Sequence, residues 1–120
     1  MEPLEPLLAA CRKACEDCDR ACEACHRFCA AMAKADMKEQ ELTLKLTADC
    51  GEMCQLCARL CARKAPLAPA MAAACLKACN ACGAACGNYA NRKPMVMCAK
   101  ACAACANICA KVGALSSQLS

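Results

Sequence analysis

The residues in this chain with the clearest capacity for chemistry are its 18 cysteines. Within each of four groups, successive cysteines are three or four residues apart, and the two intervals alternate without exception. The groups are Cys11, Cys15, Cys18, Cys22, Cys25 and Cys29; Cys50, Cys54, Cys57 and Cys61; Cys75, Cys79, Cys82 and Cys86; and Cys98, Cys102, Cys105 and Cys109. Thiolates are soft ligands that favour Cu(I), Zn(II) and iron–sulfur clusters, and they also perform redox chemistry. The regular spacing indicates that all the thiols share one use.

The alternating intervals predict that each cysteine group lies along one face of an α-helix, at heptad positions a and d. The residues between them are rich in Ala, Lys, Arg, Glu and Gln, which favour helix. Pro66, Pro69 and Pro94 fall in the breaks between the groups. The expected helices cover approximately residues 4–35, 40–64, 69–90 and 94–115. Short connections make neighbouring helices antiparallel. We therefore expect one all-α domain, residues 1–120: an up-down-up-down four-helix bundle with cysteines at the inward seam positions.

The antiparallel topology also predicts a register for the four helices. Read downward from the end of the first helix, every group steps by four, three and four residues. We therefore expect four stacked layers of four thiols, the first formed by Cys29, Cys50, Cys86 and Cys98, with Cys15 and Cys11 extending the column on the first helix alone. The next seam positions at that end are Met32, Thr47, Tyr89 and Met95, with Met37 and Met97 nearby. At the other end, mainly aliphatic residues close the bundle.

A column of thiols could serve three uses other than metal binding. Cysteine is a small buried hydrophobe when isolated, but Leu, Ile or Val would fill a whole core better. Disulfides require a specific geometry that a rigid helix holds poorly at these spacings, and they suit exported proteins. A redox enzyme or sensor would use only a few Cys-x-x-Cys pairs. The repetition of thiols at every seam position favours a metal store.

Charge separates the candidate metals. If each Cu(I) takes two thiolates and each thiolate bridges two ions, every Cu(I) replaces one proton and the core stays neutral. A Zn(II) on four thiolates leaves a charge of −2, and stacked zinc sites would bury like charges that nothing in the sequence neutralises. Iron–sulfur clusters need an opened cavity and a different cysteine spacing. We therefore predict storage of Cu(I), about one ion per thiol and up to 18 ions.

Other features of the sequence restrict the function further. The net charge of +4 is scattered and aromatic residues are scarce, which argues against a nucleic-acid partner. The N-terminus lacks the pattern of a signal peptide, so we expect a cytoplasmic protein. Pro66, Pro69 and Lys77 interrupt the most apolar stretch, which falls short of the roughly 20 residues that span a bilayer. A single His and the lack of nucleotide-binding or nucleophile motifs predict that the chain is not an enzyme.

Methionine and histidine side chains are the additional candidate ligands. Met32 and Met95 lie on the seam at one end, where thioethers would pass Cu(I) inward, so we include both among the predicted metal ligands. Met37 and Met97 lie off the seam and are weaker candidates. His26 flanks the seam, which favours a surface or interhelical hydrogen bond over ligation.

The repeated segments "CLKACNACGAAC" (Cys75–Cys86) and "CAKACAACANIC" (Cys98–Cys109) resemble the bacterial copper storage proteins, and the resemblance extends over essentially the whole chain. It implies Cu(I) along the bundle axis, CxxxC pairs as two-coordinate clamps, assembly into a homotetramer and the cytosolic branch of that family. The implied partners are copper ions and a copper chaperone or chelator, with no membrane. A zinc or heavy-metal buffer, and less readily a thiol redox protein, remain alternatives.

Overall fold

The computed structural model describes residues 4–32, 37–89 and 91–115. These residues form four α-helices and no strand: α1 (Leu4–Met32), α2 (Met37–Ala62), α3 (Ala68–Gly87) and α4 (Lys93–Gly113). The all-α fold class is confirmed, and the observed bounds lie within a few residues of the expected ranges. The expected ends at residues 35 and 90 fall outside the described residues.

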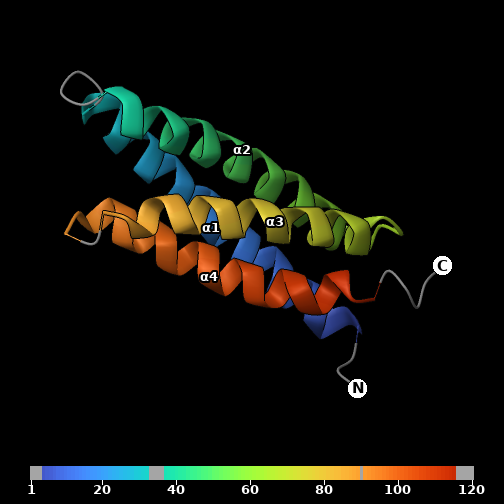
Figure 1. Ribbon diagram of the computed structural model, residues 1–120. Helices are drawn as coiled ribbons and strands as arrows, with labels where there is room; N and C mark the ends of the chain where they lie inside the picture. Colours follow the sequence, from blue (N-terminus) through green and yellow to red (C-terminus); the bar gives the residue numbers. More distant parts are fainter. Residues whose placement is uncertain (1–3, 33–36, 90, 116–120) are drawn as a thin grey trace.

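The helices form an elongated antiparallel bundle (Figure 1). α1 packs against α2 and α4, and α3 packs against the same two helices, so each helix has two main neighbours. The molecule measures 48 × 19 × 19 Å, long and narrow enough for one continuous core along the axis. The predicted up-down-up-down topology is confirmed.

The connections follow from local sequence. Prolines occupy the first turns of α3 and α4, where a missing N–H leaves no helical hydrogen bond unmade. Between α2 and α3, Lys64 takes a positive φ of 53°, and its ammonium pairs with Glu5 Oε1 at 2.5 Å. At the end of α4, a Cβ added to Gly113 would lie 3.1 Å from Ala73 Cα. Gly113 therefore permits a close approach of α4 to α3.

The core consists mainly of sulfur. Every one of the 18 cysteines is buried, with at most 3% of its surface exposed. Leu7, Leu8, Ala72 and Val112 are also buried and belong to the same apolar core. The inward orientation of the cysteine seam is therefore confirmed.

α3 and α4 are long and apolar enough, by length and composition alone, to cross a membrane. This differs from the expectation from the sequence, which considered only the stretch interrupted by prolines. Cysteine counts as apolar in mean hydropathy, and the cysteines of both helices are buried in the bundle. Four buried cysteines in each helix contribute to its apolar character, together with its alanines.

Candidate metal centre

The thiols of the four helices meet along the bundle axis in what we call the column, meaning all 18 cysteine side chains. Between α1 and α4 the Sγ–Sγ distances are 3.9 Å for Cys11–Cys109, 3.6 Å for Cys15–Cys105, 3.7 Å for Cys18–Cys102 and 3.8 Å for Cys22–Cys98. α2 and α3 meet through Cys50–Cys79 at 3.8 Å and Cys54–Cys75 at 3.7 Å. Thiols from neighbouring helices therefore lie in contact along most of the axis.

The observed register corrects the predicted layers. Cys98 meets Cys22, one heptad before the expected Cys29, whereas Cys50 meets Cys18, eleven residues before it. On α3, Cys50 meets Cys79 rather than Cys86, a shift of one heptad. Shifts of seven and of eleven residues both keep thiols on the seam opposite one another, so the spacing alone could not choose between these registers.

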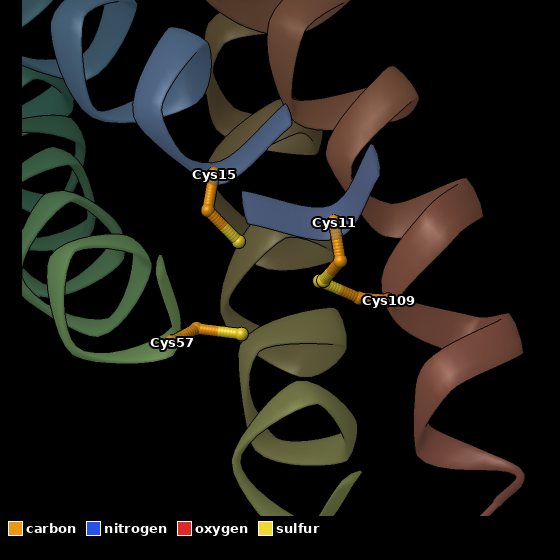
Figure 2. Close-up of side chains that lie close together, drawn as sticks. All are labelled: Cys11, Cys15, Cys57 and Cys109. Carbon is orange, nitrogen blue, oxygen red and sulfur yellow. The ribbon is translucent and has the colours of Figure 1, made fainter. Parts of the chain in front are cut away.

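In the observed register, Cys11 and Cys15 contact thiols of other helices, whereas the prediction gave them no such partners. Figure 2 shows Cys11 and Cys15 of α1, Cys57 of α2 and Cys109 of α4 directed toward one another. Their four sulfur atoms all lie within 4.8 Å of one another. The column is therefore longer than four layers and staggered, with no isolated extension on α1.

Several such four-thiol groups overlap. They include Cys15, Cys75, Cys105 and Cys109; Cys18, Cys50, Cys54 and Cys79; Cys18, Cys22, Cys50 and Cys102; and Cys22, Cys82, Cys98 and Cys102. Successive groups share thiols: Cys18 belongs to two of them, as does Cys22. Pairs at i and i+4 on one helix also stand close, with Cys18–Cys22 at 3.9 Å and Cys105–Cys109 at 3.8 Å. The ligand sets are continuous rather than separate.

α2 supplies hydroxyls instead of thiols in one part of the core. Its seam continues from Cys50 toward the start of the helix through Thr47 and Thr43, and each is only 2% exposed. In the observed register, Thr47 is level with Cys22 and Cys98, and Thr43 is level with Met95. This part of the column therefore receives sulfur from three helices instead of four.

Met95 is the methionine that joins the column. It is 1% exposed, and its Sδ lies 3.2 Å from Cys25 Sγ and 3.5 Å from Cys29 Sγ. Met32 is half-buried at the end of α1, while Met97 is 56% exposed. Met37 begins α2, but its side chain lies outside the described residues. We call the region around Met95, Cys25 and Cys29 the Met95 end.

His26 makes interhelical hydrogen bonds, as its flanking position favoured. Its Nδ1 lies 3.0 Å from Thr47 Oγ1 and 3.1 Å from the Leu44 carbonyl oxygen. The Thr47 hydroxyl donates to the Thr43 carbonyl at 2.8 Å. Because the Leu44 carbonyl oxygen can only accept a hydrogen bond, the contact with it assigns the proton to His26 Nδ1.

The thiols titrate together because they are packed against one another without a buried cation among the described residues. Contact with the Cys102 thiol lowers the pKa of Cys18. The same neighbour raises the pKa of Cys22, and burial adds to that effect. Contact with Cys86, together with burial, raises the pKa of Cys25, and burial raises that of Cys29. Contacts with neighbouring thiols lower the pKa of Cys98 to about 2 and that of Cys105 to about 6. Near neutral pH, the thiols with raised pKa values retain their protons.

This donor set fits a soft monovalent ion. Every predicted cysteine ligand is placed in the column, and the closest cysteine pairs, with Sγ–Sγ distances of 3.6 Å, are well beyond the disulfide bond length of about 2.05 Å. Ions that each take two thiolates could be accommodated at successive positions along shared sulfurs. Tetrahedral zinc would need four thiolates to itself, and the overlap of the groups works against that.

Two features of the site were missed from the sequence. The first is the shift in register, for which the repeated spacing carries no signal. The second is that Thr43 and Thr47 lie on the seam of α2 inside the column, where the other helices have sulfur. The seam spacing of α2 gives both positions, but the prediction included only Thr47 and placed it beyond the end of the thiols.

Comparisons with known proteins agree with this architecture. Residues 5–114 match the sequence profile of the family described as copper storage protein. Apo copper storage protein 3 from Bacillus subtilis is 30% identical, with a TM-score of 0.77 over 88% of this chain and 97% of that one. A cytosolic copper storage protein from Streptomyces lividans, solved during loading with five coppers, is 26% identical, with a TM-score of 0.80 over 92% of this chain and 95% of that one.

The Cu(I)-bound form of the Bacillus subtilis protein is 29% identical, with a TM-score of 0.80 over 89% of this chain and 98% of that one. No curated sequence matches the chain. The family profile covers nearly the whole length of this chain, and the solved relatives share its helical fold. The chain therefore belongs to the copper storage protein family.

Proposed function

We propose that this protein stores Cu(I) on the thiolates of its column, with a capacity of about one ion per thiol and up to 18 ions. The observation that carries the proposal is the overlap of the four-thiol groups, which lets each sulfur serve two ions. The related proteins solved with bound copper support the choice of metal.

The proposed ligands are all 18 cysteines together with Met32 and Met95. Each Cu(I) replaces one thiol proton, so the filled core carries no net charge. A neutral filling matters because the core is narrow and offers no buried counter-charge among the described residues.

Loading takes place through the Met95 end in this proposal. Met95 Sδ touches the sulfurs of both Cys25 and Cys29, so an ion bound to the thioether is already next to two thiols. A thioether binds Cu(I) without carrying charge and without losing a proton, which suits a transient ligand. Met32 is half-exposed at the same end of α1 and is the outer candidate.

The remaining parts of the proposal concern the setting of the protein. We place it in the cytoplasm, as for the cytosolic relative from Streptomyces lividans, and assign it no catalytic activity. Copper arrives from a chaperone or small chelator, and the bundles assemble into homotetramers. Light scattering of the purified protein tests the assembly directly.

The central test is an anaerobic titration of the reduced apo protein with Cu(I) against a chromophoric chelator, with Zn(II) titrated in parallel. Native mass spectrometry counts the bound ions individually. We expect tight uptake of about one Cu(I) per thiol and far weaker, less numerous binding of Zn(II). Tight saturation by about four Zn(II) would instead support a zinc buffer. Saturation at one or two Cu(I) would reduce the site to a single centre.

A further inference from the structure

A cavity of about 330 Å³ opens on the side of the bundle between α1 and α2. We call it the side cavity. Its lining includes Asp19, Cys22, Glu23 and His26 from α1 and Thr47 and Glu52 from α2. Two further cavities along α1, lined in part by Arg12 and Glu16, contain no cysteine. The side cavity thus combines a column cysteine, an imidazole, three carboxylates and the guanidinium of Arg27.

Cys22 lines the side cavity and belongs to the column. Its Sγ lies 3.9 Å from Cys18 and Cys82 and 3.8 Å from Cys98. On the cavity side, Gly51 of α2 faces Cys22, and an added Cβ there would lie 3.7 Å from Cys22 Cβ. Because Gly51 has no side chain, α2 places none over Cys22 at this position.

His26 is prepared for metal binding by its hydrogen bonds. With Nδ1–H donated to the Leu44 carbonyl and Thr47 Oγ1, Nε2 keeps its lone pair. The described residues give Nε2 no hydrogen-bond partner. Metal-binding histidines usually donate their second ring N–H to a carbonyl in this way, which fixes the tautomer and the ring orientation.

Cys22 and His26 are four residues apart on α1, the same spacing as the CxxxC pairs of the column. Residues at i and i+4 are neighbours on a helix surface, and Cys18–Cys22 shows the closeness that this spacing gives two sulfurs. A thiolate and an imidazole at this spacing offer Cu(I) two soft or borderline donors. Asp19 and Glu52 supply negative charge that attracts a cation into the cavity, whereas Glu23 is ion-paired with Arg27, which also lines it.

We propose that Cys22 and His26 form a two-coordinate Cu(I) site on the side of the bundle, through which copper passes directly to or from the column. His26 Nε2 donates its lone pair to the ion, and Cys22 binds it as a thiolate after releasing its proton to the acidic cavity. The copper stays Cu(I) throughout. This inference rests on the proposed storage function and adds a lateral route, which enters between α1 and α2 beside the Met95 end.

The chain has a single histidine, so the test can observe His26 without ambiguity. The reduced apo protein with ¹⁵N-labelled histidine is titrated anaerobically with Cu(I) supplied as its acetonitrile complex. We expect the Nε2 resonance to shift within the first few equivalents while Nδ1 keeps its proton. A merely structural hydrogen-bonding role would leave Nε2 unchanged.

Uptake kinetics provide the second arm. We expect His26→Gln to slow transfer from a chromophoric Cu(I) chelator about tenfold, an effect of the size seen when groups around a metal are removed, and to do so in a Met95→Leu background too. Glu23→Gln should slow uptake about threefold by weakening the attraction of the cation. Glu16→Gln is the matched control, because Glu16 forms the same type of exposed i,i+4 ion pair on α1 outside the side cavity.

The outcomes separate the two proposals. An Nε2 resonance that stays fixed through full loading, or that moves only once the column is full, overturns the side site while the storage function stands. Equal rates for Glu23→Gln and Glu16→Gln also count against it. If the wild-type chain takes up no copper, the storage function and the side site fail together. The NMR arm uses the wild-type protein, so a variant that does not fold leaves this test intact.

Discussion

Replacing Thr43 with cysteine should add one copper to the store. Thr43 is 2% exposed and continues the seam of α2 at the level of Met95, where α2 contributes no thiol. A cysteine there would add a fourth sulfur near Cys25, Cys86 and Met95, and Cys25 already lies 3.6 Å from Cys86. With each thiolate shared by two ions, capacity should rise from about 18 to about 19.

The substitution should leave the apo fold intact. Cysteine lacks the γ-methyl group of threonine, a loss of about 0.8 kcal/mol of apolar burial. Removing a buried hydroxyl acts in the opposite direction, because a hydroxyl is costly to bury. We therefore expect the free energy of unfolding to change by about 1 kcal/mol or less.

Native mass spectrometry of the loaded protein measures the copper number as an integer, and a thiol assay of the unfolded protein confirms the added cysteine. Thr43→Val, which keeps the shape of the side chain without a sulfur, should hold the wild-type number. A Thr43→Cys protein with wild-type helicity, one extra titratable thiol and unchanged copper content would refute the reasoning that seam position determines ligation.

Three further predictions follow from other parts of the structure. Met95→Leu should slow Cu(I) uptake yet change the free energy of unfolding by less than about 1.5 kcal/mol, since the two side chains have similar volumes. Met97→Leu is the control, because Met97 is exposed. Equal stopped-flow rates of uptake for the two variants would remove Met95 from the loading route. Copper affinity should fall as pH falls, with about one proton released per Cu(I), because the raised pKa values of thiols such as Cys22 and Cys25 keep them protonated. Calorimetry in buffers of different ionisation enthalpy counts the released protons. A count near zero would contradict the protonated thiols. The raised pKa values of Cys22 and Cys25 contribute stability to the apo protein that is fully present below the unfolded thiol pKa of about 8.5 and is lost as pH rises beyond it. Thermal unfolding between neutral and alkaline pH should show this loss as a falling Tm. Gly113→Ala should lower the free energy of unfolding by about 1–3 kcal/mol, because its Cβ would meet Ala73 Cα at 3.1 Å and Ala73 N at 3.2 Å. Gly87→Ala is the control: its Cβ would meet nothing within 4 Å, so it should not destabilise the protein. Equal Tm values for the two variants would show that α3 and α4 separate at no cost.

The sequence was sufficient for the helices and for the face that each one buries. The intervals of three and four residues select the α-helical period, and prolines in the first turns of α3 and α4 locate two helix starts. Burial of all 18 cysteines follows from that pattern, because the helices have hardly any other apolar seam to bury.

The register could not be obtained in the same way. A pattern that repeats every seven residues gives the same set of facing thiols after a one-heptad shift, so Cys22 and Cys29 are equivalent partners for Cys98 as far as spacing is concerned. The choice depends on close packing between particular residues; for α3 and α4, Gly113 against Ala73 and Gly83 against Cys102 are such contacts. Those contacts are set by the three-dimensional approach of the helices, which the spacing of one residue type does not encode.

The replacement of thiols by Thr43 and Thr47 on one helix makes the store uneven along its length. Ions in the middle of the column can exchange among sulfurs from four helices, while ions near Met95 have fewer sulfurs and one uncharged thioether. Sites with different numbers of thiolates hold copper with different strengths, so free Cu(I) in equilibrium with the protein would rise gradually with loading. The molecule would then act as a buffer over a range of copper concentrations, with its most loosely held ions available first.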